Sequence, residues 1–420
     1  MSKILIKNIR TLVQVDNGER LKVSGADMKK LPCLHNAWLA IENDKIVSYG
    51  TMDDWGGITD WSNLTVIDAT NKIVMPCYCD SHTHIVYAGS REGEFVDRIN
   101  GLSYEQIFER GGGILNSAKK LSDATEEELI ESALKRLNEI MMMGTGAVEI
   151  KSGYGLSKNS ELKMLRVIKK LKTLSPLTIK ATFLGAHAVP TEYKNRKSDY
   201  IKLLINEIMP AIAEEQLADY CDVFCEQNYF TKEETIEILT AAKKYGMTPK
   251  VHAEQLSNSG GVLAGIEVGA ISVDHLEFVG DIEIEALKNS KTMPTILPGA
   301  AFFLGLPLPP ARKMMDAGLA IAVASDYNPG SSPSGNMNFM LSLCCVQYKM
   351  TPEEAINAAT INSAYAMDLS KTHGSIAIGK QANIFITQEI PGYEYIPYAF
   401  ASNLMETVII NGKLVMDDGK

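Results

Sequence analysis

Short apolar runs alternate with amphipathic stretches through the middle of this 420-residue chain. Between residues 73 and 372, each run has the length of a buried strand, and the stretch after it has the apolar spacing of a helix. Strands are expected at 73–79, 145–150, 178–184, 221–225, 249–253, 271–275, 292–297 and 320–325. Helices are expected at 124–143, 159–173, 199–215, 232–245 and 352–367. Eight alternating units predict an α/β fold, a TIM-like (β/α)₈ barrel.

Both ends of the chain show a different pattern. From residue 3 to about 72, short apolar runs are separated by turn residues, which is typical of an antiparallel sheet. After residue 372, the runs 383–386 and 407–410 also resemble strands, and Asn411-Gly412 predicts a turn. We expect residues 1–72 and 373–420 to form one small β-sandwich domain, and residues 73–372 to form the barrel as a catalytic domain.

Histidines and an aspartate stand where several predicted strands end. His82 and His84 are two residues apart, so an extended backbone directs both imidazoles to the same side. A bare His-x-His pair is as often a surface feature as a metal site, but His252, His275 and Asp326 follow later strands in the same way. Strand ends of a barrel meet at one rim, where its chemistry is located. A site for zinc, iron or nickel is therefore predicted there.

Other strand ends add candidate residues. Tyr154 lies in the glycine-flanked turn after the second strand, and His187 follows the third. An ordinary turn and a buried core histidine are the alternatives for these two. The fourth strand ends in Cys225-Glu226-Gln227, without a lysine to bridge two metals. One metal is therefore expected rather than two.

Composition narrows the class of partner. Acidic residues outnumber basic ones 51 to 41, and the formal charge of −10 argues against nucleic acid and favours a small-molecule substrate. The chain has seven cysteines, an odd number, without zinc-knuckle or thioredoxin spacing. The N-terminus lacks a signal-peptide pattern, and no apolar run is long enough for a membrane helix. We expect a cytoplasmic protein with reduced thiols and no membrane partner.

The chain resembles the amidohydrolase superfamily. That superfamily carries a His-x-His on strand one, histidines on strands five and six, and an aspartate on strand eight. Within it, the likeness is to the branch that opens a cyclic amide with a propionate side chain during histidine degradation. The matching stretches are 80–84 with Arg91, 110–114, 149–155, 185–187, 252–254, 273–276, 309–312 and 325–330, and they span nearly the whole barrel. The runs Lys-Ser-Gly-Tyr-Gly and Asp-Tyr-Asn-Pro-Gly-Ser are the most specific.

The resemblance implies roles for the strand-end residues. One divalent metal, Zn²⁺ or Fe²⁺, would activate a water for attack on the ring carbonyl. Its implied ligands are His82, His84, His252 and Asp326, and the implied acid/base residues are Glu254, His275 and Asp326. Glu254 lies two residues past His252, which on a strand would give it the same orientation. Whether His275 is a ligand or an acid/base stays open, and so does the identity of the group that activates the water.

Substrate contacts are implied in the same way. Arg91 offers a fork for the propionate, for which a surface ion pair is the alternative. The other implied contacts are Tyr154, His187, Glu254, Asn328, Gly330 and Ser331. A homodimer would also fit the resemblance.

Two other functions compete with this interpretation. A deaminase of the same superfamily would attack a ring carbon that bears an amine, but a neutral base gives Arg91 no carboxylate to bind. A metal-retaining scaffold without activity would not need the complete residue set. Two positions depart from the superfamily pattern: Cys77 stands where glycine is usual, and Asn383 stands where aspartate is common. We expect both to affect local packing rather than chemistry.

Overall fold

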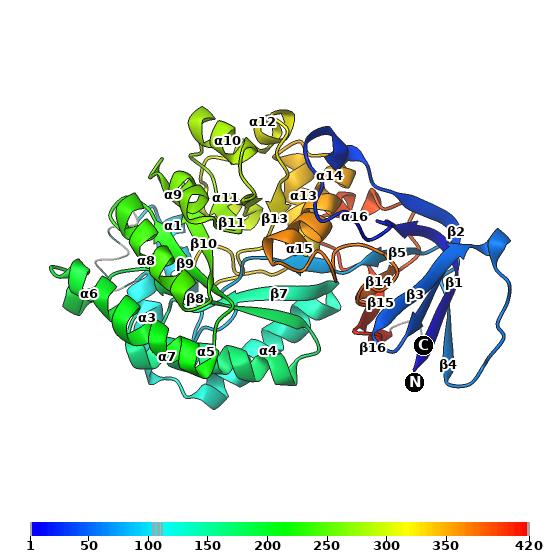
Figure 1. Ribbon diagram of the computed structural model, residues 1–420, viewed down its shortest axis with the longest axis horizontal. Coiled ribbons are helices and arrows are strands. Elements are labelled where there is room, and N and C mark those ends of the chain that lie inside the picture. The colour runs from blue at the N-terminus through cyan, green and yellow to red at the C-terminus, as the bar shows by residue number, and fades with distance from the viewer. Residues whose placement is uncertain (1, 103–105, 107–109, 111, 418–420) are drawn as a thin grey trace.

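The computed structural model describes residues 2–102, 106, 110 and 112–417 of the chain. Within these residues, a barrel of strands and helices adjoins a smaller sheet built from both ends of the chain (Figure 1). Gly111, in the resemblance stretch 110–114, lies outside the described residues. The expected fold class is confirmed.

Parallel strands in sequence order form the barrel. They are β6 (Tyr78–Asp80), β7 (Thr145–Lys151), β8 (Thr178–Ala186), β9 (Tyr220–Cys225), β10 (Thr248–Ala253), β11 (Ser272–His275), β12 (Met293–Ile296) and β13 (Ala322–Val323). Nearly all of their residues are buried, because helices cover the outside of the strands and side chains fill the inside. The strand ends predicted from the apolar runs therefore meet at one rim.

The segments after the first and last strands close the barrel. The backbone N–H of Asp326 donates to the carbonyl of His82 at 3.0 Å, and that of His84 donates to the carbonyl of Tyr327 at 2.9 Å. Just below, the carboxylate of Asp80 accepts from the backbone N–H and the hydroxyl of Ser325. Closure thus takes place at the residues that carry the predicted metal ligands.

Helices surround the barrel strands in Figure 1. They are α1 (Glu92–Ile99), α3 (Ile114–Asp123), α4 (Glu126–Met142), α5 (Lys158–Leu174), α6 (Lys197–Leu203), α7 (Met209–Glu215), α8 (Lys232–Lys244), α9 (Gly261–Val268), α10 (Asp281–Lys288), α11 (Pro298–Leu304), α12 (Ala311–Asp316), α13 (Met337–Val346), α14 (Pro352–Asn357), α15 (Ser363–Ala366) and α16 (Tyr395–Tyr398). Short 3₁₀ turns span Gly25–Lys29, Met52–Asp54 and Thr191–Tyr193. Capping boxes that begin at Thr125, Thr231 and Thr351 fix the starts of α4, α8 and α14.

Two predicted helices are interrupted. A π-helical turn at Leu204–Ile208 separates α6 from α7, and another at Ala358–Asn362 separates α14 from α15. An apolar spacing of three and four residues does not distinguish a continuous helix from one with a single wider turn. The ranges 199–215 and 352–367 were therefore correct in extent and incomplete in geometry.

The smaller sheet combines strands from both ends of the chain. Its strands are β1 (Lys3–Val13), β2 (Cys33–Glu42), β3 (Lys45–Thr51), β4 (Leu64–Asp68), β5 (Ile73–Pro76), β14 (Ile384–Thr387), β15 (Met405–Ile410) and β16 (Lys413–Asp417). They pair in the order β16-β15-β14-β5-β1-β2-β3, with β4 also on β1. The antiparallel pairing expected for residues 3–72 is confirmed for β1, β2 and β3, but it is wrong for β4, which runs parallel to β1. Strand β5, just beyond that range, also runs parallel to β1. A bulge in β1 between Ile6 and Ile9 separates the two parallel pairings.

The first predicted barrel strand, 73–79, is in fact two strands. Residues 73–76 form β5 of the smaller sheet, where they pair with β14 and β1. Only residues 78–80 pair with barrel strand β7. An uninterrupted apolar run carries no mark of this transfer between sheets, because both strands are fully buried. The division of the chain at residues 72 and 372 remains a proposal, and the strand pairing places β5 with the terminal segments.

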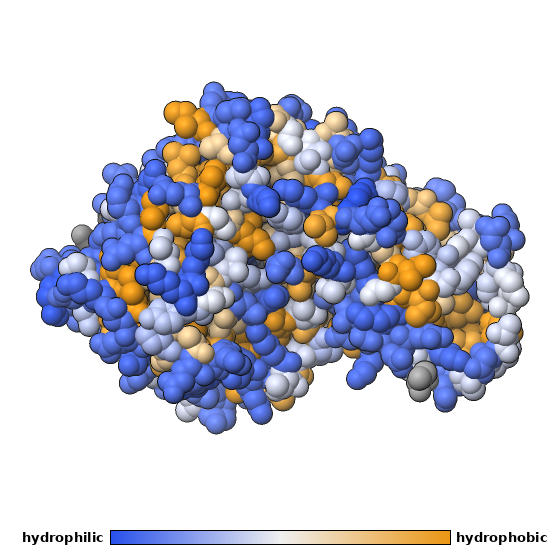
Figure 2. Space-filling view, viewed as in Figure 1, coloured by the Kyte–Doolittle hydropathy of each residue, from blue (hydrophilic) through white to orange (hydrophobic). Residues whose placement is uncertain are grey.

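Hydrophilic residues dominate the face of the molecule in Figure 2, and the hydrophobic ones form separate small patches. Among the described residues, no helix has both the length and the apolar composition to cross a membrane. All seven cysteines lie in the described part of the chain as free thiols, as expected.

Cys77 and Asn383, the two residues that depart from the superfamily pattern, contact each other where the barrel joins the smaller sheet. The backbone N–H of Cys77 donates to the carbonyl of Asn383 at 2.9 Å. Gly146 of β7 packs directly on both, since a β-carbon at this glycine would lie 2.5 Å from Cβ of Cys77 and 3.3 Å from Cβ of Asn383. Because residue 77 has a side chain, residue 146 must be glycine.

We predict that Gly146→Ala lowers the free energy of unfolding by about 1–3 kcal/mol, the usual cost of overpacking a core. The cost should be smaller when Cys77 is also replaced by glycine, because the clash then disappears. Urea unfolding of wild type, both single variants and the double variant measures the coupling. Strictly additive effects would contradict this account of the junction.

Candidate metal centre and active site

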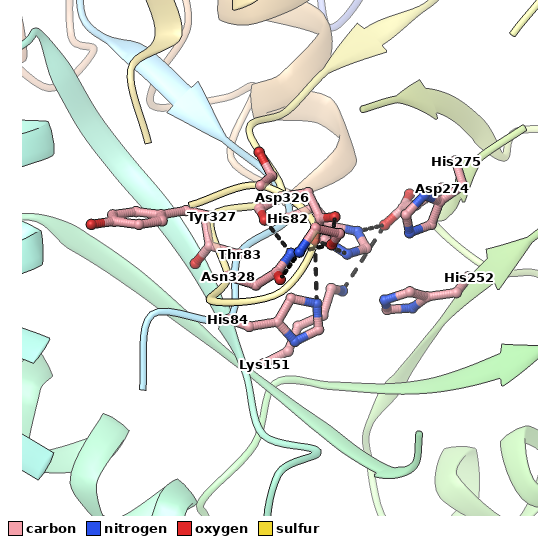
Figure 3. Close-up of polar contacts among 12 residues, drawn as sticks. His82, Thr83, His84, Lys151, His252, Asp274, His275, Asp326, Tyr327 and Asn328 are labelled. Carbon is pink, nitrogen blue, oxygen red and sulfur yellow. Dashed lines mark hydrogen bonds and ion pairs between the residues drawn. The ribbon is translucent and has the colours of Figure 1, made fainter. Parts of the chain in front are cut away.

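Three histidines and an aspartate converge at the rim of the barrel (Figure 3). His82 and His84 follow β6, His252 lies in β10, and Asp326 follows β13. Each of the three histidines offers a ring nitrogen within 4.8 Å of those of the other two, and all four residues are at most 3% exposed. The sequence prediction thus placed together residues that are more than 200 positions apart in the chain.

The spacing of these donors suits a metal ion. Oδ1 of Asp326 lies 3.6 Å from Nε2 of His82 and 3.5 Å from Nε2 of His84. Ligand atoms at about 2.0–2.1 Å from a tetrahedral ion are roughly 3.4 Å apart, so the observed separations match. Nε2 of His82 is also buried without a hydrogen-bond partner among the described residues. A buried ring nitrogen of this kind is costly unless something binds it, and a divalent ion fits the donor set.

Carboxylates behind two of the imidazoles fix their orientation. Nδ1 of His82 lies 2.7 Å from Oδ2 of Asp274, and Nδ1 of His252 lies 3.0 Å from Oδ2 of Asp222. These contacts leave Nε2 of each ring for the centre. Burial, together with the Lys151 charge, lowers the pKa of His82 well below its usual range. The neutral imidazole that a metal requires is therefore the favoured form.

His275 lies beside this group and has its own carboxylate partner. Its ring centroid is 5.2 Å from that of His252, and its Nδ1 is 3.7 Å from Oε1 of Glu277. Burial alone would lower the pKa of His275, but the adjacent Glu277 carboxylate outweighs it and the pKa is raised. A protonated His275 is suited to donate a proton.

Glu254 does not follow the strand geometry on which its predicted orientation relied. The chain turns into the left-handed region at this residue, with φ of 51°, just after β10 ends. Its carboxylate accepts from the backbone N–H of Val262, at 3.0 Å to the nearer oxygen, in the first turn of α9. Burial raises the pKa of Glu254 to about 8, so the carboxyl group is mostly protonated at neutral pH. Its proposed contact with substrate remains a prediction.

Tyr154 and His187 line one side of the centre. The His187 ring stacks on His84, with centroids 5.4 Å apart, and the Tyr154 ring is 5.8 Å from His84. Nδ1 of His187 lies 3.0 Å from the carbonyl of Gly153. A β-carbon at Gly153 would lie 2.9 Å from that nitrogen, and its φ of 104° also favours glycine. The close packing of the turn on His187 therefore requires this glycine.

The loop after β13 is held by Asn328. Its side-chain amide donates to the carbonyl of Asp326 at 2.6 Å and to the hydroxyl of Ser331 at 2.7 Å, and its oxygen accepts from the N–H groups of Gly330 and Ser331. Ser331 in turn donates to Oδ2 of Asp326 at 3.1 Å. Asn328 thus uses its polar atoms to shape the loop, and Ser331 orients a predicted ligand.

Arg91 lies against the same loop. A β-carbon at Gly330 would come within 2.2 Å of Nη1 of Arg91. Nε and Nη2 of Arg91 donate to one oxygen of Glu94 in α1, and the Arg91 charge acts on the pKa of both Tyr154 and His187. Part of the alternative reading is therefore correct, since Arg91 forms an ion pair, but the pair lies at the rim and is mostly buried.

The residues that sequence reasoning missed lie below the rim. Asp222, Asp274 and Lys151 are fully buried in barrel strands and contact the ligand histidines or their carboxylate partners. Charged residues within otherwise apolar strands are rare, and that rarity was the signal in the sequence.

Solved structures with the same fold include several deaminases. Guanine deaminase from E. coli superposes with a TM-score of 0.74 at 13% identity, covering 99% of both chains. 5-Methylcytosine deaminase from Klebsiella pneumoniae, liganded with 5-fluorocytosine, has a TM-score of 0.73 at 17% identity, covering 98% of this chain and 97% of that one. At such low identity, the likeness supports the fold alone.

Sequence comparisons are more specific. The amidohydrolase family profile matches residues 73–415. An imidazolonepropionase of Christiangramia forsetii is 59% identical over 98% of this chain and 100% of its own length. One of Flavobacterium johnsoniae is 56% identical over 98% of this chain and 99% of its own. The chain therefore belongs to the amidohydrolase family, and within that family to the imidazolonepropionases.

Proposed function

We propose that this chain hydrolyses the cyclic amide of 4-imidazolone-5-propanoate to N-formimidoyl-L-glutamate, a step of histidine degradation. The observation that carries the proposal is the presence of Arg91 beside the donor set, against the loop that follows Asp326. A cyclic amide with a propionate tail needs both a metal to activate water and a cation for its carboxylate. A heterocyclic base without an acidic tail needs only the first.

The residues that would hold the ion are His82, His84, His252 and Asp326. Three imidazoles and one carboxylate accept zinc or ferrous iron about equally well. The ion would supply Lewis-acid activation of water and of the ring carbonyl. Ser331 keeps the Asp326 carboxylate oriented, so that this carboxylate can also take the proton of the attacking water.

Proton delivery to the departing nitrogen falls to His275 or Glu254. The pKa of Glu254, raised by burial to about 8, leaves its carboxyl group with a proton to donate near pH 7, and the Glu277 carboxylate raises the pKa of His275 above its usual value. Tyr154 and His187 would offer aromatic faces to the imidazolone ring, and Asn328, Gly330 and Ser331 of the loop after β13 would provide the other contacts. Exclusion of water follows from the burial of these side chains, of which Tyr154 is 2% and His187 8% exposed.

Arg91 would bind the propionate. Glu94 holds its guanidinium through Nε and Nη2, and Glu94 is itself fixed by the backbone N–H of Gly113 at 3.1 Å. Such support reduces the conformational entropy that Arg91 loses when it binds a carboxylate. A cytoplasmic location and a homodimer complete the proposal.

The first prediction concerns the metal. A purified preparation should contain one divalent ion per chain, and His82→Ala or Asp326→Ala should abolish turnover together with metal content. His373→Ala is the matched control, because this buried histidine binds Thr178 at the opposite end of a barrel strand. Elemental analysis and assays of imidazolone absorbance measure both effects. An active preparation without metal would end this reading.

The second prediction concerns the propionate. Arg91→Lys keeps the charge but loses the planar fork, so kcat/KM should fall about 10- to 100-fold, equivalent to about 1.5–3 kcal/mol. The same change at Arg312 is the control, because Arg312 forms a comparable two-bond pair with Glu354 outside the site. Steady-state kinetics of both variants decide the question. Unchanged kinetics for Arg91→Lys would reassign this arginine to a structural role.

The third prediction separates ring opening from deamination. Water adds to the ring carbonyl carbon, the ring C–N bond breaks, and a proton goes to the departing nitrogen. One water is consumed, and no ammonia is released. In ¹⁸O-water, a single turnover should place label in the carboxylate next to the α-carbon, because that carbon is the former ring carbonyl. Mass spectrometry and an ammonia assay test this. Stoichiometric ammonia, or an unlabelled α-carboxylate, would contradict the proposed reaction.

A further inference from the structure

A cluster of charged side chains fills the barrel directly below the metal centre. We name Glu149, Lys151, Asp222, Lys250 and Asp274 the buried charge cluster. They come from β7, β9, β10 and β11, and all are fully buried. Branched apolar residues normally fill the inside of such a barrel. Ions in this position are costly unless they are paired and hydrogen-bonded.

Glu149 is the shared partner of both lysines. Nζ of Lys151 donates to Oε1 of Glu149 at 2.6 Å, and Nζ of Lys250 donates to the other carboxylate oxygen. Lys151 also donates to Oδ2 of Asp222 at 2.7 Å. Each lysine Nζ lies 4.0 Å from Oδ2 of Asp274. The two lysines therefore connect Glu149 to both of the other carboxylates.

Those two carboxylates, Asp222 and Asp274, contact the ligand histidines. Asp274 contacts Nδ1 of His82, and Asp222 contacts both Nδ1 and the backbone N–H of His252. Figure 3 shows Asp274 between His82 and Lys151. Lys250 further donates to the carbonyl of Ser81 at 2.9 Å, immediately before His82. Glu149 is thus connected to both ligands through other side chains. Among the described residues, it makes no direct contact with either imidazole.

A purely structural role does not account for this arrangement. Well-packed apolar residues of similar volume often stabilise a protein as well as a buried ion pair does. The contacts of the cluster instead converge on the two ligand rings, where a carboxylate on Nδ1 fixes ring orientation and aims Nε2 at the ion. Thr182 adds a further hydrogen bond to Oε1 of Glu149, so that this carboxylate is itself held in place.

We propose that Glu149 is a positioning residue of the metal centre, acting through Lys151 and Lys250 on Asp222 and Asp274 and so on His252 and His82. This inference rests on the metal centre of the proposed function. In Glu149→Gln an amide replaces one carboxylate oxygen, so one lysine loses its acceptor and shifts toward the remaining acids. Both histidines then lose the carboxylate contacts that align them, and metal affinity should fall about 10- to 100-fold, the range usual when such a contact to a ligand is lost.

Cobalt(II) is the probe, because its d–d absorption reports coordination geometry as well as occupancy. The full-length protein is stripped with a chelator and titrated with Co²⁺ in competition with a chromophoric chelator. Glu149→Gln should raise the Kd for Co²⁺ about 10- to 100-fold and change the d–d spectrum at saturation. Glu149→Asp, which keeps the charge, should restore part of the affinity.

Glu354→Gln is the matched control. Glu354 is also a buried carboxylate, paired with Arg312 and part of the cap of α14, but it touches none of the ligands or their partners. This variant should bind Co²⁺ with wild-type Kd and spectrum. Should Glu149→Gln fail to fold, Thr182→Val replaces it, because it removes only the hydrogen bond to Glu149 and keeps the side-chain shape. It should raise the Kd in the same direction, by about threefold or more.

The outcomes separate this inference from the proposed function. A wild-type apoprotein that binds no Co²⁺ would overturn the metal centre itself. Wild-type binding together with an unchanged Kd and spectrum in Glu149→Gln would overturn the positioning role alone. An equal loss of affinity in Glu354→Gln would also overturn it, since the effect would then be a general one on the fold.

Discussion

Two backbone hydrogen bonds close the barrel, and the proposed metal centre depends on them. They join the segments that carry His82 and His84 to the segment that carries Asp326. Strand β13 has only two residues, so these segments and the Asp80–Ser325 contact provide much of the join between the first and last strands. The separations between three of the four donors are therefore set by backbone pairing. The centre cannot assemble until the barrel has closed.

Periodicity was enough to predict the barrel because each buried strand is a short apolar run followed by an amphipathic helix. Periodicity did not predict the features that leave no periodic trace in the sequence. The run 73–79 passes from one sheet to the other at Cys77, with buried residues on both sides. The direction of β4 was missed because strand pairing is a long-range property that local patterns do not encode. The π-turns were missed for the related reason that one wider turn barely shifts a helical stripe.

The convergence of the proposed metal donors was predictable because strand ends of a barrel share a rim. Their partners were not, because Asp222 and Asp274 lie one layer deeper and act through contacts between strands. Lys250 lies two residues before His252 on the same strand. Its Nζ donates to Glu149 and to the carbonyl of Ser81, which come from other segments of the chain. A charge within an apolar strand indicates that a partner exists, but it does not indicate which one. The orientation expected for Glu254 failed because the strand ends one residue earlier.

Positive φ angles make the rim of the barrel a strained part of an otherwise stable fold. Glu254, His275 and Asp326 have φ of 51°, 89° and 55°, a region where residues with a β-carbon lose roughly 1–2 kcal/mol each. Glycine or asparagine would adopt these conformations with less strain. The barrel below absorbs that strain through its close packing and its backbone closure. If stability alone determined the sequence, these turns would not hold carboxylates and imidazoles. The rim therefore gives up some stability to keep side chains that can take part in chemistry.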